Sequence, residues 1–192
     1  TKPAEAIKVV YDTGQRDFGE NYVAEAVEKI LALESLDIYW HFLGPLQSNK
    51  TRLVATHFDW IHSVDRIKIA KRLNEQRPDE LPPLNVCLQV NIPAEATKSG
   101  VSSETELLEL ALAINEMDRL ALRGIMAIPA PAADVGQQRE QFKRISQLLS
   151  IPVLPMQMKE LSMGMSGDME SAVAEGATMV RIGTDIFGAR YN

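Results

Sequence analysis

The stretch "MVRIGTDIFG", Met179 to Gly188, has the apolar start of a buried strand but carries polar groups that a buried strand normally lacks. Arg181 interrupts the apolar run, and Gly183 and Thr184 follow it directly. A buried guanidinium is costly unless it has partners. A glycine allows close approach of the backbone to a ligand, and a threonine adds a hydroxyl. The stretch therefore predicts a strand that ends at a binding site.

Six further stretches have the length and composition of strands. With the stretch above, the predicted strands cover residues 16–21, 38–44, 60–65, 84–92, 120–128, 159–164 and 178–184. Helical patterns lie between them. Residues 66–76 place Ile67, Ala70, Leu73 and Asn74 along one side of a helix. Residues 103–117 begin with the capping box of Ser103 and Glu106, and residues 167–177 end at Gly176, as a left-handed C-terminal cap would. Such alternation favours parallel strands with helical crossovers.

The chain opens with a further helical pattern at residues 1–14, which Thr1 could cap and Gly14 could end. In an alternating fold a strand should precede this helix, and one more strand makes eight, the number that closes a β/α barrel. The 192 residues are fewer than the roughly 250 typical of such barrels. We therefore predict one domain over residues 1–192, a (β/α)8 TIM barrel that lacks its first strand. A seven-stranded open sheet is the alternative.

The composition excludes several classes of protein. The chain is 45% apolar and 24% charged, as globular proteins are, and its net charge of −6 argues against a nucleic-acid or anionic-membrane surface. No apolar run reaches the roughly 18 residues of a membrane span. The single cysteine, Cys87, lies in an apolar run, so we read it as a small buried hydrophobe and expect a cytoplasmic protein without disulfides.

The carboxyl ends of the predicted strands are polar. They read "GEN" (19–21), "WHF" (40–42), "HSVDR" (62–66), "VNI" (90–92), "SMGMS" (162–166) and "RIGT" (181–184). In a β/α barrel these ends converge on one mouth, where active groups sit, and the loops after the last two strands commonly bind phosphate. Hydroxyls of Ser162 and Ser166, before the start of a helix, fit such a site with Arg181 beside it. The residues alone leave open that Gly183 is only a turn and Arg181 a paired structural charge.

Other polar residues also have two interpretations. His41 could contact a ligand or fill the barrel, and Asn21 could contact a ligand or cap the next helix. His62, between Ile61 and Ser63, fits a core histidine with satisfied hydrogen bonds better than a ligand contact. The three histidines have no carboxylates at metal-ligand spacing, so we predict no metal site. Lys50 and Lys98 lie in predicted loops and are expected to be solvated.

Seven motifs together resemble one known family. The motifs "FGENYVAEAVEKI", "WHFLGPLQSNK", "IHSVDR", "KSG", "RGIMAIPAP", "LSMGMSGDME" and "MVRIGTDIFGAR" resemble those of the pyridoxal phosphate homeostasis proteins, in order and over essentially the whole chain. The resemblance implies a single barrel similar to the N-terminal barrel of alanine racemase. It also implies binding of pyridoxal 5′-phosphate (PLP) through a lysine Schiff base. The expected role is to buffer, carry or deliver PLP, without turnover.

The resemblance assigns roles to residues of this chain. Arg181 would face the pyridine nitrogen, and Asn21 and His41 would line the ring. Ser162, Gly183 and Thr184 would hold the phosphate, and Met163 is a further candidate contact with PLP. The first lysine of the family motif "SKTKP" carries the Schiff base and would directly precede Thr1, so Lys2 corresponds to the second lysine of that motif.

The expected partners are PLP and PLP-requiring apo-enzymes, with no nucleic acid and no membrane, and the expected state is a monomer. A PLP-dependent racemase-like enzyme is the alternative, although Tyr11, Tyr22, Tyr39 and Tyr191 all lie in helix, strand-start or terminal contexts. A third reading is a barrel for another phosphate ester, such as a sugar phosphate.

Overall fold

The computed structural model of the chain describes residues 2–91 and 99–189. Within these residues one sheet contains seven strands, which are hydrogen-bonded in chain order and all parallel. They are β1 (Asp17–Glu20), β2 (Tyr39–Phe42), β3 (Trp60–Val64), β4 (Leu84–Val90), β5 (Leu120–Ala127), β6 (Glu160–Met165) and β7 (Met179–Arg181). The cap predicted at Thr1, the strand end predicted at Ile92, Lys98 and Tyr191 all lie outside the described residues.

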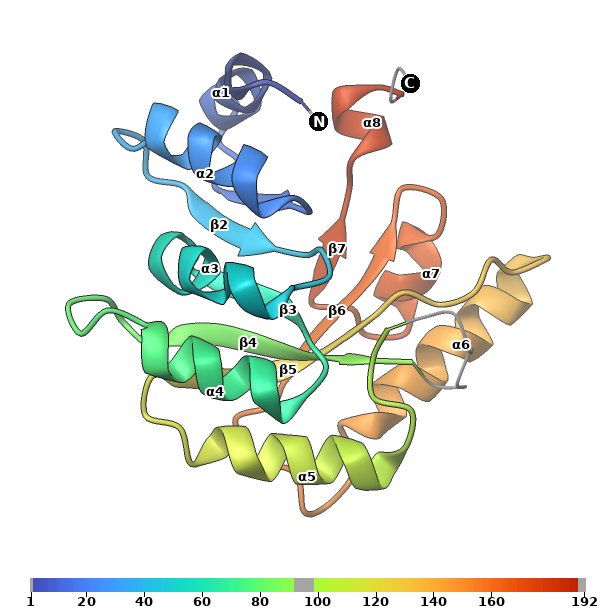
Figure 1. Ribbon diagram of the computed structural model, residues 1–192. Helices are drawn as coiled ribbons and strands as arrows, with labels where there is room; N and C mark the ends of the chain where they lie inside the picture. The colour runs from blue at the N-terminus through green and yellow to red at the C-terminus, as the bar shows by residue number, and fades with distance from the viewer. Residues whose placement is uncertain (1, 92–98, 190–192) are drawn as a thin grey trace.

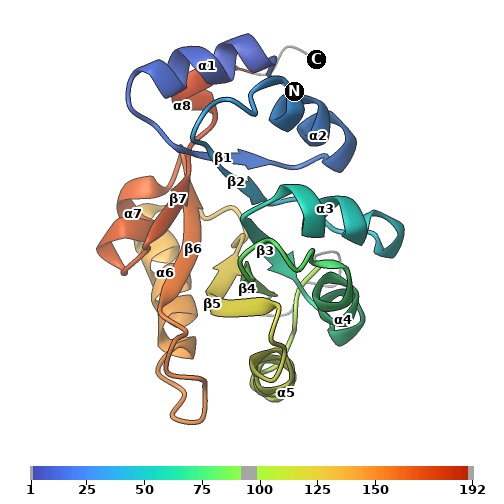
Figure 2. The same cartoon turned by 90° about the vertical axis from the view of Figure 1, so that its left-hand side faces the viewer.

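Helices connect the strands and cover the outer side of the curled sheet (Figures 1 and 2). They are α1 (Ala4–Asp12), α2 (Val23–Ala32), the 3-10 turn η1 (Ser48–Lys50), α3 (Thr51–His57), α4 (Ile67–Gln76), α5 (Glu104–Asn115), α6 (Val135–Leu148), α7 (Met169–Ala174) and α8 (Thr184–Phe187). The glycine stops are as predicted, since Gly14 after α1 has φ of +109° and Gly176 after α7 has φ of +95°. This arrangement confirms the predicted β/α barrel architecture.

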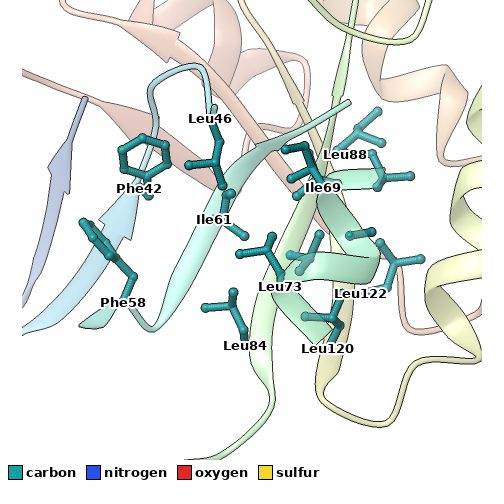
Figure 3. Close-up of a cluster of buried hydrophobic side chains, with 14 of the residues drawn as sticks. Phe42, Leu46, Phe58, Ile61, Ile69, Leu73, Leu84, Leu88, Leu120 and Leu122 are labelled. Carbon is teal, nitrogen blue, oxygen red and sulfur yellow. The ribbon is translucent and has the colours of Figure 1, made fainter. Parts of the chain in front are cut away.

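The apolar core lies between the strands and the helices that pack on them. Figure 3 shows Ile69 and Leu73 of α4 pointing toward Ile61, Leu84 and Leu88 of the neighbouring strands, and all of these side chains are fully buried. The predicted apolar face of α4 was partly wrong, because its first residue is exposed and Ile69 takes its place. With 3.6 residues per turn, positions 69, 70 and 73 share a side of the helix, and position 67 lies away from it.

The last strand differs from the prediction in length and in burial. It ends at Arg181, and Gly183 and Thr184 form the start of α8 instead of continuing the strand. All three residues of β7 are only half-buried. The reason is its place at the edge, since among the described strands β7 pairs with β6 alone.

The two edge strands, β1 and β7, lie on either side of a gap that α1 and α8 span. Both views place these two helices together at one end of the molecule (Figures 1 and 2). Lys2 connects them, because its Nζ donates a hydrogen bond of 2.6 Å to the carbonyl oxygen of Phe187. An eighth strand before α1 stays a prediction.

Candidate functional site

A cavity of about 810 Å³ lies between the two edge strands and extends from their first residues to the loops at their carboxyl ends. Its walls come from β1 and the turn after it, from the β6–α7 loop, and from β7 with the start of α8. Lining residues include Lys2, Asp17, Asn21, Tyr22, His41, His62, Met165, Ser166, Arg181, Gly183 and Thr184. The predicted convergence is thus confirmed for four of the polar strand ends and for His62. Asp65 and Arg66 of "HSVDR" line a separate groove of about 560 Å³.

Arg181 enters the cavity from the last strand and is held from behind by neutral acceptors. Its Nη1 donates to Ser162 Oγ at 2.9 Å, and its Nη2 donates to the carbonyl oxygen of Ala127 at 2.9 Å. Desolvation by burial lowers the pKa of Arg181 to about 10, so the guanidinium stays charged at neutral pH. Among the described residues no carboxylate lies within ion-pair distance of it. Its remaining N–H groups are therefore available to an acceptor on a ligand.

Two histidines continue the contacts behind Arg181. His62 Nδ1 lies 2.7 Å from Ser162 Oγ, and His62 Nε2 lies 2.9 Å from His41 Nδ1. His41 Nε2 lies 3.0 Å from Oδ1 of Asp17, whose side chain is exposed. Desolvation by burial lowers the pKa of both histidines, that of His62 well below its ordinary value. His62 is thus a buried histidine with hydrogen-bonded partners, as the sequence favoured, and it also borders the cavity.

The part of the cavity next to Arg181 offers hydroxyls and open backbone. The Oγ of Ser166 is buried and has no hydrogen-bond partner within the described part of the chain. A Cβ added to Gly183 would meet no protein atom within 4 Å, so the space beside it is open. Thr184, which follows it, is exposed and also lines the cavity. A buried hydroxyl without a partner is unfavourable, which makes Ser166 a good contact for a ligand oxygen.

The structure places two of the expected contacts behind the cavity wall. Ser162 is fully buried and is bonded to Arg181 and His62, so its hydroxyl supports Arg181 from behind. Met163 is also fully buried and packs in the apolar core. Neither residue lines the cavity. Ser166, which the family comparison did not select, takes the position at the wall, and its membership of the polar "SMGMS" run was the signal in the sequence.

Asn21 and Tyr22 form the turn after β1 at the rim of the cavity. Asn21 does not cap the next helix, because Tyr22 occupies the N-cap position of α2, and the side chain of Tyr22 makes no cap hydrogen bond. The turn packs tightly on the end of β2, since a Cβ on Gly44 would lie 2.0 Å from the carbonyl oxygen of Asn21. Tyr22 faces the cavity and is 57% exposed, a position that the sequence did not indicate.

A buried ion pair supports the same rim from outside. Lys29 Nζ in α2 lies 2.6 Å from Oε1 of Glu20, and both side chains are almost fully buried. Glu20 borders the cavity, so this lysine neutralises a carboxylate that would otherwise repel an anionic ligand. Sequence reasoning missed the pair because its members lie in different elements. Lys50, by contrast, is exposed and lies away from the cavity, as expected of a solvated lysine.

The described residues contain no group of three or more His, Cys, Asp or Glu that could hold a metal ion. A helix able to cross a membrane is also lacking in the part of the chain that the structure describes.

The fold and the cavity together place the chain among known proteins. A family model for the alanine racemase N-terminal domain matches residues 2–191. The pyridoxal phosphate homeostasis protein of Pseudomonas aeruginosa is 56% identical over 190 residues, which cover 99% of this chain and 81% of the relative. The protein of the same name from Escherichia coli K12 is 55% identical over 194 residues, covering 99% of this chain and 82% of the relative.

Among solved structures, PipY from Synechococcus elongatus PCC7942, determined with PLP bound, is 38% identical and superposes with a TM-score of 0.87, covering 98% of this chain and 89% of that chain. The class is therefore that of alanine racemase N-terminal barrels. Within that class the chain belongs to the family of pyridoxal phosphate homeostasis proteins.

Proposed function

We propose that this chain binds PLP in the cavity between β1 and β7 and acts in PLP homeostasis, by buffering, carrying or delivering PLP without turnover. The observation that carries the proposal is the meeting of three features in one cavity: the donor groups of Arg181, the unpartnered hydroxyl of Ser166 and the open backbone at Gly183. The names of the relatives and the PLP bound to PipY support the same ligand.

Different residues of the cavity would contact the phosphate and the ring of PLP. Ser166, Gly183 and Thr184 would hold the phosphate, and the ring would lie between Asn21 and His41 with its nitrogen toward Arg181. Bound PLP supplies an aldehyde and an electron-accepting ring. A guanidinium opposite the ring nitrogen acts only as a donor, so it holds that nitrogen unprotonated and weakens the electron sink. This suits storage better than catalysis.

The proposal includes transfer of PLP by a cytoplasmic monomer to apo-enzymes that require it. Three exposed apolar or aromatic side chains, those of Tyr22, Met165 and Ile186, border the cavity, so its mouth is accessible to large partners. Transfer is measured as recovery of activity when the PLP-loaded protein is mixed with a PLP-free aminotransferase. Recovery no faster than dissociation of PLP into solution would contradict delivery by contact.

The first test is an equilibrium titration with PLP, followed by its absorbance. Arg181→Ala should weaken binding by about tenfold to a hundredfold, the size of hydrogen bonds to a charged group. Arg66→Ala is the matched control, because it removes an equal charge from the separate groove. Equal affinity of Arg181→Ala and the unmodified chain would contradict the proposal. Displacement of PLP by ribose 5-phosphate at lower concentration would instead favour a sugar phosphate site.

A PLP-dependent amino-acid racemase is a second candidate, which the position of Tyr22 at the cavity rim favours. Such an enzyme needs a proton-transferring group on each side of the ring, and a tyrosine can be one of them. Incubation of the PLP-loaded protein with L-alanine, followed by chiral chromatography, separates the two functions. Formation of D-alanine that Tyr22→Phe abolishes would establish the enzyme, and we expect none.

A further inference from the structure

A single series of side chains connects Arg181 in the cavity wall to the solvent-exposed Asp17. In order they are Arg181, Ser162, His62, His41 and Asp17, with successive donor–acceptor distances of 2.9, 2.7, 2.9 and 3.0 Å. The three middle side chains are buried, whereas the side chain of Asp17 is 61% exposed. His41 is held further by Trp60, whose ring stacks on it at a centroid distance of 5.4 Å. We call these five side chains the relay.

The ends of the relay determine the position of every proton in it. A guanidinium can only donate and an ionised carboxylate can only accept, so Arg181 donates to Ser162 and His41 donates to Asp17. His41 then carries its proton on Nε2 and accepts on Nδ1, which requires His62 to donate from Nε2. His62 must accept on Nδ1, and the proton it receives comes from the hydroxyl of Ser162. One direction satisfies all four contacts while both histidines stay neutral.

We propose that Asp17 sets the direction of the relay, and that the relay in turn positions Arg181 as a hydrogen-bond donor to the ligand in the cavity. Asp17, His41, His62 and Ser162 are on this view positioning residues for Arg181. The proposal depends on the proposed function only in naming PLP as that ligand. Its consequence is that a change at the exposed Asp17 alters Arg181, a residue that it does not touch, at the other end of the relay.

The charged groups around the relay agree with this direction. Asp17 and Asp59 face His41, and Arg181 faces His62. The guanidinium and burial both disfavour a second proton on His62, and burial outweighs the effect of the two carboxylates on His41. A proton added to His41 would make its Nδ1 a donor, so Nε2 of His62 would have to accept and the proton of His62 would lie on Nδ1. Both His62 and Arg181 would then donate to Ser162, which reverses the two middle contacts of the relay.

The test reads the proton positions directly in the protein without ligand. The chain has only three histidines, so long-range ¹H–¹⁵N spectra of the histidine-labelled protein can be assigned with a His57→Gln variant. We expect His41 and His62 to carry their protons on Nε2 at pH 7.5. Asp17→Asn should shift the tautomer equilibrium of both, because an amide can donate as well as accept. Asp185→Asn, an equal charge change outside the relay, should shift neither.

An unchanged His62 in Asp17→Asn, or an Nδ1 proton on either histidine of the unmodified chain, would overturn the proposal. Ser162→Ala removes only the partner of His62 Nδ1, so both histidines should keep their protons on Nε2 while Asp17 is present, even if PLP binding is lost. In a titration with PLP, Asp17→Asn should weaken binding about threefold to tenfold, which corresponds to the free energy of one hydrogen bond. If the tautomers shift as expected but no variant or unmodified protein binds PLP, the relay stands and the proposed function fails.

Discussion

At the scale of the residue, two glycines have different reasons to be glycine: Gly183 leaves space for a ligand, and Gly124 leaves space for a neighbouring strand. A Cβ on Gly183 meets no protein atom within 4 Å, and its φ of −115° suits any residue, so the fold tolerates a side chain there. Gly183→Val should therefore keep the thermal midpoint of the chain but weaken PLP binding by about tenfold or more, because the side chain occupies ligand space. Titration with PLP and thermal unfolding measure the two effects.

Gly124 provides the contrast, because a Cβ there would lie 1.9 Å from the carbonyl oxygen of Glu160 on the neighbouring strand. Gly124→Ala should lower the free energy of unfolding by about 2 kcal/mol or more, as overpacking does. If Gly183→Val lost stability and kept its affinity for PLP, Gly183 would be a structural turn and the phosphate region would lie elsewhere.

The sequence predicted which single residues line the cavity where those residues interrupt an apolar pattern. Arg181 and Gly183 interrupt an apolar run, and both line the cavity. The distinction between Ser162 and Ser166 was not predictable, because β6 is buried at four successive positions and shows no alternation that would reveal which side chains face inward. The relay was also invisible, since its members come from β1, β2, β3, β6 and β7 and meet only when the sheet curls.

At the scale of the element, α8 depends on a contact with the other end of the chain. It has only four residues, too few to form a stable helix alone, and Lys2 Nζ donates to Phe187 at its end. Lys2→Met should accelerate amide hydrogen exchange in residues 184–188 and change global stability by less than about 1 kcal/mol. Lys8→Met, which removes only an exposed ion pair with Asp12, is the control. Equal exchange in both variants would refute the contact.

Helix ends were predictable when a side chain made the cap. Ser103 Oγ accepts from the backbone N–H of Glu106, as the capping box predicted. Ser103→Ala should therefore cost about 1 kcal/mol of stability in urea unfolding, and a cost near zero would mean that water replaces the cap. The start of α8 was instead predicted as strand, because its N-cap residue, Gly183, has no side chain that could make a cap and apolar residues continue on both sides of it.

At the scale of the whole molecule, strand–helix alternation predicted the architecture well, since each strand needs only local signals and the parallel order follows from the crossovers. Curling of the sheet is a global property. It brings β1 and β7 to opposite walls of one cavity, although about 160 residues separate them, and it moves two histidines out of water. The burial of the relay therefore adds a pH dependence to the stability of the entire fold.

Acid should destabilise this protein through His41 and His62. Both have a pKa below the ordinary 6.5 in the folded state, so the unfolded chain binds protons more readily below that pH. Their contribution is complete above pH 6.5 and is lost as the pH falls below it. Between pH 7.5 and 5.0 the free energy of unfolding in urea should fall, by at most about 2 kcal/mol for His62 and by less for His41. His62→Gln keeps a donor and an acceptor but cannot titrate, so its stability should fall less over the same interval. A decrease as large as that of the unmodified chain would show that His62 is already charged, or equally easily charged, in the folded barrel.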